Sequence, residues 1–254
     1  MNLPTPFLGK VTAITITSPD LAASLVFYQQ LGFSELMRMD FPFPWILISD
    51  GALMMMLRQD NTPYLALTYY VKDIAQIAQA LEAKGIVFKQ KPSDNDFVKR
   101  YLFQTPDLFN ISLVNLMDGF HQPKGATMLG MNPSDYANPD AYVNKSCGMF
   151  GELAHPVADL DASIAYWEQL GFAVLSQFSF PYPWAIISDG LAIVGLHQTT
   201  NFNYAAITYF ASDMTQKIEA LKQKGLANFV VNHEGNIVVT TPEQQHINLF
   251  SLGM

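Results

Sequence analysis

Asp20 to Phe33 reads DLAASLVFYQQLGF and Asp159 to Phe172 reads DLDASIAYWEQLGF, with identical residues at eight of 14 positions. A second pair of blocks, FPFPWILISDG over 41–51 and FPYPWAIISDG over 180–190, is identical at eight of 11 positions. Both pairs recur after the same 139 residues. Blocks that recur in one register, with unequal sequence between them, indicate an internal duplication. The 254-residue chain is therefore predicted to contain two similar halves.

A fainter repeat lies inside each half, where an aspartate is followed 12 residues later by a glycine. An aspartate side chain accepts hydrogen bonds from the free amides of a first helical turn. A glycine readily adopts the left-handed conformation that ends a helix. Between them, Leu21, Leu25 and Tyr28 follow a helical period. The sequence thus predicts four helices, bounded by Asp20 and Gly32, Asp73 and Gly85, Asp159 and Gly171, and Asp213 and Gly225.

Segments rich in β-branched and apolar residues flank each predicted helix. One strand is expected before the first helix, over 11–17, and three after it, with Asp50-Gly51 as a hairpin turn. The unit is strand, helix and three strands (βαβββ), twice in each half. The expected strands of the first half are 11–17, 33–39, 45–49, 53–58, 64–71, 87–90, 98–104 and 110–116.

Residues 118–146 interrupt this pattern with repeated Gly and Pro and keep no apolar period. We therefore expect a first domain over 8–117, a linker over 118–147 and a second domain over 148–254.

The composition restricts the kind of protein and its partners. Half of the residues are apolar and 14% are charged, which is typical of a globular chain. The net charge of −8 disfavours nucleic acid and anionic membranes as partners. The single cysteine, Cys147, excludes an intramolecular disulfide, and the first residues lack the features of a secretory signal. We expect a cytoplasmic protein.

The sequence resembles the vicinal-oxygen-chelate superfamily, which includes glyoxalases, bleomycin-resistance proteins and extradiol dioxygenases. The resemblance lies in Asp20–Ser24 with Phe27-Tyr28 and Leu31-Gly32-Phe33, and in their equivalents from Asp159 to Phe172. It implies an α+β fold: four βαβββ modules form two curved, partly open mixed-sheet barrels with the helices outside. Two barrels in one chain would imitate the dimer of shorter relatives, so we expect a monomer with an internal pseudo-dimer. Because members of the superfamily differ in activity, the resemblance leaves the function open.

The resemblance also implies a divalent metal held by His, Gln or Glu on the concave face. In the first half, the equivalent positions carry Ala13, Ala66 and Ser112 and offer no such ligand. In the second half they carry Glu152, Ala206 and Asn248, with His246 nearby. Asparagine is a weak ligand for zinc or iron, so we expect no metal. The alternative is a divalent metal bound by Glu152, His246 and Asn248.

Aromatic residues suggest another use for the concave faces. The Phe-Pro-Phe-Pro-Trp and Phe-Pro-Tyr-Pro-Trp blocks place Trp45 and Trp184 either at the mouth of a cavity or at a contact between the domains. Strand alternation turns Thr68, Tyr70, Thr208 and Phe210 toward the concave faces. An apolar pocket with a few hydroxyl groups suits a flat or apolar ligand.

Three functions follow from these observations. The first is a metal-free protein of the bleomycin-resistance type that binds a small aromatic or apolar molecule. The second is a metal-dependent lyase or extradiol-type dioxygenase with one degenerate site in the second half. The third is a non-catalytic protein-interaction module, which would present an apolar surface patch instead of a cavity. We favour the first, with the ligand-binding candidates Trp45, Thr68, Tyr70, Glu152, Trp184, Thr208, Phe210, His246 and Asn248.

Overall fold

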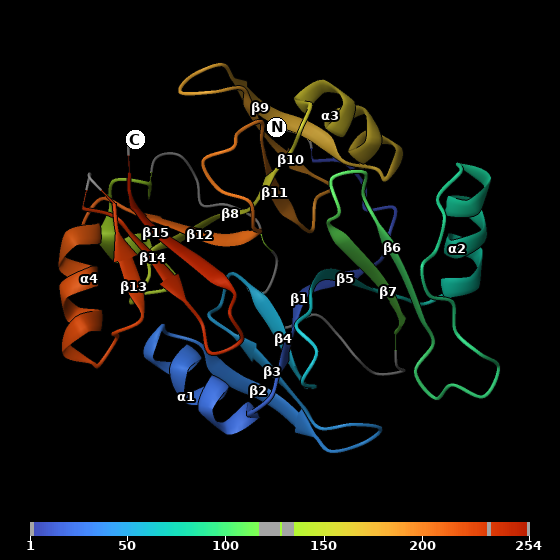
Figure 1. Ribbon diagram of the computed structural model, residues 1–254, viewed down its shortest axis with the longest axis horizontal. Coiled ribbons are helices and arrows are strands. Elements are labelled where there is room, and N and C mark those ends of the chain that lie inside the picture. The colour runs from blue at the N-terminus through green and yellow to red at the C-terminus, as the bar shows by residue number, and fades with distance from the viewer. Residues whose placement is uncertain (1–2, 117–127, 129–134, 233–234, 253–254) are drawn as a thin grey trace.

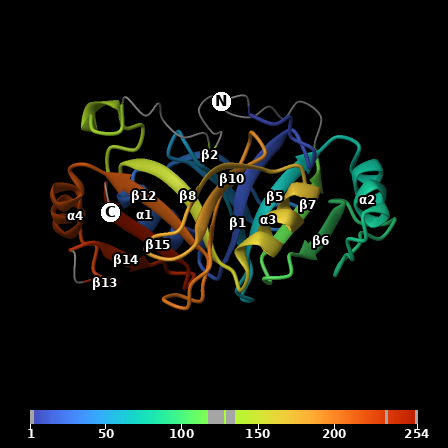
Figure 2. The ribbon, with the colours of Figure 1, turned by 90° about the horizontal axis from the view of Figure 1, so that it is seen from above.

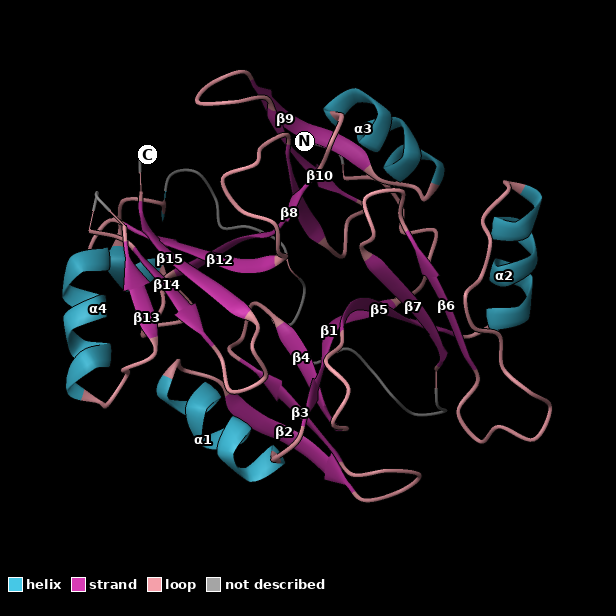
Figure 3. Ribbon diagram, viewed as in Figure 1, coloured by secondary structure: helices cyan, strands magenta, loops and turns pink. Residues whose placement is uncertain are grey.

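A computed structural model describes residues 3–116, 128, 135–232 and 235–252. Within these residues the chain forms two mixed β-sheets, of seven and eight strands, and four α-helices on the outside (Figures 1 and 3). The predicted α+β class is confirmed. Neither sheet closes on itself, so both are open sheets rather than barrels. Most of the predicted linker, 118–127 and 129–134, lies outside the described residues.

The first sheet has the strand order β2-β3-β4-β1-β5-β7-β6. Its central strand β1 pairs in parallel with β4 of its own module and antiparallel with β5 of the next. This central pairing joins the two modules into one sheet. The elements are β1 (Val11–Ser18), α1 (Leu21–Gln30), β2 (Ser34–Met39), β3 (Trp45–Ser49), β4 (Met54–Gln59), β5 (Leu65–Val71), α2 (Ile74–Ala83), β6 (Arg100–Gln104) and β7 (Asn110–Asn115).

The second sheet repeats this arrangement in the order β13-β14-β15-β12-β8-β11-β10-β9. Seen from above, the two sheets lie side by side, with α2 and α4 at opposite ends of the molecule (Figure 2). The elements are the short 3₁₀ helix η2 (Pro139–Ala141), β8 (Met149–Pro156), α3 (Leu160–Gln169), β9 (Ala173–Phe178), β10 (Trp184–Ser188), β11 (Ile193–His197), β12 (Ala206–Ala211), α4 (Met214–Gln223), β13 (Phe229–Val231), β14 (Ile237–Thr240) and β15 (His246–Ser251).

The strand expected over 87–90 does not form, so the second module of the first half has one strand fewer than predicted. Only an isolated bridge joins Gln90 to Leu102. Pro92 has no amide hydrogen to extend the pairing beyond this bridge.

The four predicted helices form, but only two have the predicted aspartate cap. The Asp20 carboxylate accepts hydrogen bonds from the amides of Ala22 and Ala23, and Asp159 accepts one from Ala162. Asp73 and Asp213 make no side-chain cap hydrogen bond. Their backbones, at ψ 63° and 30°, are less extended than those of Asp20 and Asp159. The carboxylate therefore does not reach the free amides of the first turn.

Strand alternation separates the two faces of the first sheet. On β1, Ile14 and Ile16 belong to a large core that continues into the second half. Val11 and Ala13 point to the opposite, concave face, where they form a smaller cluster with Trp45, Leu47, Met54 and Tyr70. That concave face carries the candidate site.

The segment before each half's first strand lies on the other half. A Cβ at Gly171 would lie 2.9 Å from Phe7 Cβ, and one at Gly51 would lie 2.6 Å from Val143 Cγ1. These exchanged arms, together with the shared core, tie the halves together. Among the described residues, no helix is long and apolar enough to cross a membrane.

Candidate functional site

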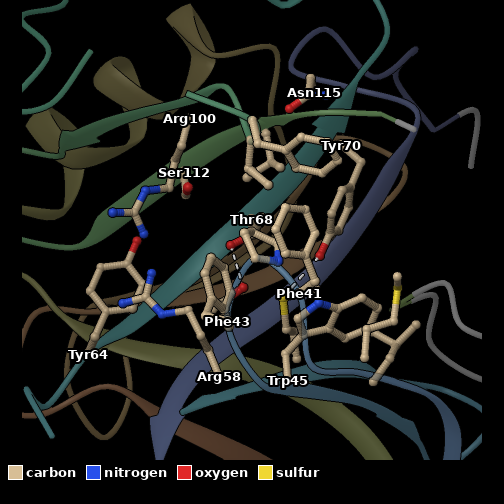
Figure 4. A pocket seen from close by; sticks show the side chains of 18 residues that line it. Phe41, Phe43, Trp45, Arg58, Tyr64, Thr68, Tyr70, Arg100, Ser112 and Asn115 are labelled. Carbon is tan, nitrogen blue, oxygen red and sulfur yellow. Dashed lines mark hydrogen bonds between the residues drawn. The ribbon is translucent and has the colours of Figure 1, made fainter. Parts of the chain in front are cut away.

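The concave face of the first sheet encloses a cavity of about 390 Å³ (Figure 4). Most of its lining is aromatic or aliphatic, and no described lining residue is His, Cys, Asp or Glu. The apolar and aromatic lining residues are Met39, Phe41, Pro42, Phe43, Trp45, Leu47, Met56, Tyr64, Tyr70, Phe97, Val98 and Val114, and the polar ones are Thr15, Arg58, Thr68, Arg100, Ser112 and Asn115.

The twofold period of the strands explains this lining. On β4, Met56 and Arg58 alternate with Met55 and Leu57, which belong to the core on the other face. On β5, Thr68 and Tyr70 face the cavity while Leu67 and Tyr69 face the core. The same strands that build the core therefore build the cavity with their remaining side chains.

Phe41 and Phe97 mark the mouth of the cavity. They lie on two different loops, their ring centroids are 4.9 Å apart, and they are 60% and 65% exposed. The loop that carries Phe97 has a shorter counterpart in the second half: Gly85 and Pro106 are 21 positions apart, whereas Gly225 and Pro242 are 17 apart.

One end of the cavity is positively charged. The Arg58 guanidinium lies 5.5 Å from the centre of the Phe43 ring and 5.6 Å from that of Tyr64, and it forms an ion pair of 3.0 Å with Asp60. Arg100 donates a hydrogen bond of 2.8 Å to Gln90. Burial lowers the pKa of Arg100, and the neighbouring Arg58 charge lowers it further. Figure 4 shows both guanidinium groups beside Tyr64, at some distance from Trp45 and Tyr70.

Two donors at this charged end are unused. Arg58 Nε and Tyr64 Oη are buried and make no hydrogen bond of normal geometry among the described residues, with the Ser112 hydroxyl as the polar neighbour of Tyr64. Burial raises the pKa of Tyr64, so its hydroxyl keeps its proton at neutral pH. Elsewhere in the cavity the polar groups are paired: the hydroxyls of Thr15 and Thr68 lie 2.7 Å apart, and the Tyr70 hydroxyl donates to Met56 Sδ at 3.6 Å.

The concave face of the second half is covered by a chain of aromatic rings. Trp184 stacks on Phe178 at 4.2 Å and on His197 at 5.6 Å, and Tyr204 lies 3.8 Å from the His246 ring. Phe202 connects the two groups, with its ring 5.6 Å from His197 and 5.7 Å from Tyr204. These rings occupy the face on which the first half has its cavity.

Glu152 is bound inside this second face. Its Oε1 lies 3.0 Å from His197 Nε2, its Oε2 has no partner among the described residues, and the residue is 4% exposed. Gly195 makes room for this carboxylate, because a Cβ there would lie 1.8 Å from Oε2. His197 in turn faces the Tyr182 hydroxyl at 3.4 Å.

The residues at the expected metal positions do not fit a metal site. Ser112 lines the first cavity and Ala13 lies in the cluster on the same face, and neither offers a carboxylate or imidazole. In the second half Asn248 donates to Thr208, which stands between Asn248 and Glu152 in the sheet. His246 lies one step farther along, opposite Ala206. Across the described part of the chain, no three or more His, Cys, Asp or Glu side chains are grouped to hold a metal.

The structure separates the candidate residues into two sets. Trp45, Thr68 and Tyr70 meet in the first cavity. The other six lie on the second sheet: Glu152, Trp184, Thr208, Phe210, His246 and Asn248. Neither tryptophan has a ring contact across the halves in the described structure, since Trp45 lines the cavity and Trp184 packs on rings of its own half.

Sequence reasoning missed the charged end of the cavity. Arg58 follows Met54 and Met56 in strand alternation, so the sequence predicts that its side chain lies on the same face of the sheet as theirs. Arg100 and Tyr64 come from distant segments, and no local pattern marks them as partners of Arg58. His197, which stands 139 residues after Arg58, was missed as the partner of Glu152 for the same reason.

Comparisons with known proteins agree with this architecture. Residues 10–113 match the family model described as Glyoxalase/Bleomycin resistance protein/Dioxygenase superfamily. The 2,3-dioxygenase LapB from Pseudomonas sp. KL28 is similar in structure at a TM-score of 0.60 and 14% identity, covering 98% of this chain and 94% of that one. Homoprotocatechuate 2,3-dioxygenase from Arthrobacter globiformis is similar at a TM-score of 0.61 and 15% identity, covering 99% and 82%. None of the curated proteins matches the chain in sequence.

A third similar structure is 2,2',3-trihydroxybiphenyl 1,2-dioxygenase from Sphingomonas wittichii strain RW1, with a TM-score of 0.57, 15% identity and coverage of 98% and 91%. At such identities the structural likeness defines the fold and not the activity. The protein is thus a two-sheet, tandem form of the vicinal-oxygen-chelate fold. Its first half matches the model of the glyoxalase, bleomycin-resistance and dioxygenase superfamily, and the similar structures show the same fold over the whole chain.

Proposed function

We propose that this protein binds a small molecule with a flat aromatic or otherwise apolar body in the cavity of its first half, without a metal ion. The observation that carries the proposal is the cavity of about 390 Å³, lined mainly by rings and aliphatic side chains. This volume lies within the range of ordinary small-molecule sites, about 300–1,000 Å³.

The other two candidate functions have less support. A metal-dependent lyase or dioxygenase needs several donor atoms around one point, and the Glu152, His246 and Asn248 side chains are engaged with different neighbours. A protein-interaction module needs an exposed apolar patch, whereas six aromatic rings of the first half line the cavity. We further propose that the chain acts in the cytoplasm as a monomer, with the paired halves taking the place of a dimer.

A cavity-filling substitution tests the proposal. Val114 lies opposite Tyr70 in the first sheet, and the equivalent pair in the second sheet is Phe250 and Phe210, with ring centroids 6.3 Å apart. Val114→Phe should therefore fit the fold while it fills the cavity. We expect it to weaken binding of the neutral probes 2-naphthamide and 2-naphthol by about 5- to 100-fold in calorimetric titration, since overpacking costs about 1–3 kcal/mol.

Val230→Phe is the matched control, because Val230 is 70% exposed on the second half, away from the cavity. It should bind the probes like the unmodified protein. Binding should also be unchanged after treatment with a chelator. Equal affinity of the two variants, or binding that requires added divalent metal, would contradict the proposal.

A further inference from the structure

We propose that the natural ligand of this cavity carries a single carboxylate, bound by Arg58, Arg100 and Tyr64, at the end opposite to its apolar body. This inference rests on the proposed function, because it concerns the same cavity. It names the class of ligand: an aromatic or aliphatic monocarboxylic acid.

The first argument is the pair of unused donors. Arg58 Nε and Tyr64 Oη both lie at the charged end and both have a hydrogen to donate, yet neither makes a hydrogen bond of normal geometry among the described residues. The polar neighbour of the Tyr64 hydroxyl is the Ser112 hydroxyl, which is not a charged acceptor. Buried polar groups in folded proteins are almost always hydrogen-bonded, so such groups in a cavity point to a partner that the ligand brings. A carboxylate offers two oxygens that only accept.

The second argument is charge. The cavity lining holds two guanidinium groups and no acidic side chain, and the nearby Asp60 carboxylate neutralises one charge by its ion pair with Arg58. One positive charge remains, in a protein whose net charge is −8. Two partly buried cations side by side are unfavourable without a counter-ion. A monoanion balances this charge, whereas a phosphate dianion exceeds it.

The third argument is preorganisation. The Arg58 guanidinium is held between the rings of Phe43 and Tyr64, and Arg100 is held by its hydrogen bond to Gln90. A guanidinium whose position is already restricted loses little conformational entropy when it binds a carboxylate. Ser112, which also lines this end, supplies a hydroxyl beside the two arginines (Figure 4).

The second half shows what the same fold does without such a ligand. His197 takes the place of Arg58 and binds the internal carboxylate of Glu152 at 3.0 Å. In the first half the position equivalent to Glu152 is Ala13, which provides no acceptor. Arg58 pairs with Asp60, which does not line the cavity, and inside the cavity it has no carboxylate in the place that Glu152 takes beside His197. A carboxylate from the ligand can take that place.

Matched ligands of equal shape test the inference. We expect the protein to bind 2-naphthoate about 10- to 100-fold more tightly than 2-naphthamide, which is the usual contribution of hydrogen bonds to a charged group. Arg100→Gln and Arg58→Gln should remove most of this preference, because they weaken the binding of 2-naphthoate far more than that of 2-naphthamide. Tyr64→Phe should reduce the preference less. Arg38→Gln, at an exposed arginine paired with Glu35, is the control and should keep it.

The outcomes separate this inference from the proposed function. Equal affinity for 2-naphthoate and 2-naphthamide overturns the carboxylate assignment and leaves the proposed function standing. Absence of binding by either, and by 2-naphthol, contradicts the proposed function itself. Arg58 packs on two rings that line the cavity, so Arg58→Gln can also weaken the binding of 2-naphthamide. In that case Arg100→Gln and Tyr64→Phe decide the carboxylate assignment. Binding of 2-naphthyl phosphate more than about tenfold tighter than 2-naphthoate would overturn the choice of a monoanion.

Discussion

Asp50 and Asp189 show how a single residue type serves two purposes in this chain. Each closes its own hairpin turn, by accepting hydrogen bonds from the amides of Ala52 and Leu53 or of Leu191 and Ala192. Each is also reached by a tyrosine of the other half: Tyr209 donates to Asp50 at 2.6 Å and Tyr69 donates to Asp189 at 2.7 Å. The turn motif thus also joins the halves.

The two tyrosines are expected to differ in their contribution to stability. Tyr69→Phe leaves Asp189 Oδ2 without the Tyr69 donor, whereas Asp50 Oδ2 also accepts from Asn144 at 3.0 Å and keeps that bond in Tyr209→Phe. An unsatisfied buried acceptor costs about 1–3 kcal/mol. We expect Tyr69→Phe to lower the free energy of unfolding by that amount and Tyr209→Phe by less, as measured by urea denaturation. A larger loss in Tyr209→Phe would disprove this explanation.

The helices illustrate how far a repeated motif predicts local geometry. All four Asp-to-Gly segments form helices, and each closing glycine has a positive φ, between 85° and 97°. The aspartate cap, however, forms only where the aspartate itself has an extended backbone, as at Asp20 and Asp159. At Asp73 and Asp213 a tight turn follows the strand directly, and the carboxylate does not reach the free amides.

Two alanine substitutions at equivalent helix starts test this difference. Asp20→Ala removes two cap hydrogen bonds of 3.0 Å and should reduce stability by about 1 kcal/mol, the usual value for an N-cap. Asp73→Ala removes none and should change stability by only a few tenths of a kcal/mol. Denaturant titration of both variants measures the two values. Equal losses would show that the side-chain cap is not the cause.

The arrangement of the two halves makes them depend on each other. One apolar core runs from Ile14 in the first sheet to Leu153 in the second, and the arms before β1 and β8 are exchanged. Further contacts cross the boundary in matched pairs: the Ser24 hydroxyl donates to Glu243, and the Ser163 hydroxyl donates to Asp107 at 2.5 Å. Each partner acid follows a proline near the last strand of the opposite half.

We therefore expect both halves to unfold in one cooperative transition. Trp45 and Trp184 occupy equivalent positions and report on the first and second half. The variants Trp167→Phe/Trp184→Phe and Trp45→Phe/Trp167→Phe carry the same core substitution and leave one reporter each. Their fluorescence curves in urea should have the same midpoint as far-UV circular dichroism. Two separated midpoints would show that each half is stable without the other.

The duplication, the four helices and most of the strands were predictable because each rests on a short-range pattern. A repeated block, a two-residue period or an aspartate followed by a glycine reports on backbone geometry within a few turns of chain. The strand expected over 87–90 is reduced to one bridge at Gln90, which Pro92 cannot extend. The replacement of the expected metal ligands by Ala13 and Ala66 could also be predicted from the sequence, because identifying those positions requires only their place within a strand.

The charged end of the cavity was not predictable in this way. Arg58, Tyr64 and Arg100 come from the end of β4, the approach to β5 and the start of β6, and they meet because the sheet order places these elements around one concave face. The two halves share most of their local patterns, yet one face encloses a cavity while rings cover the other. That difference depends on which side chains meet across strands, a property of long-range pairing that no single segment contains.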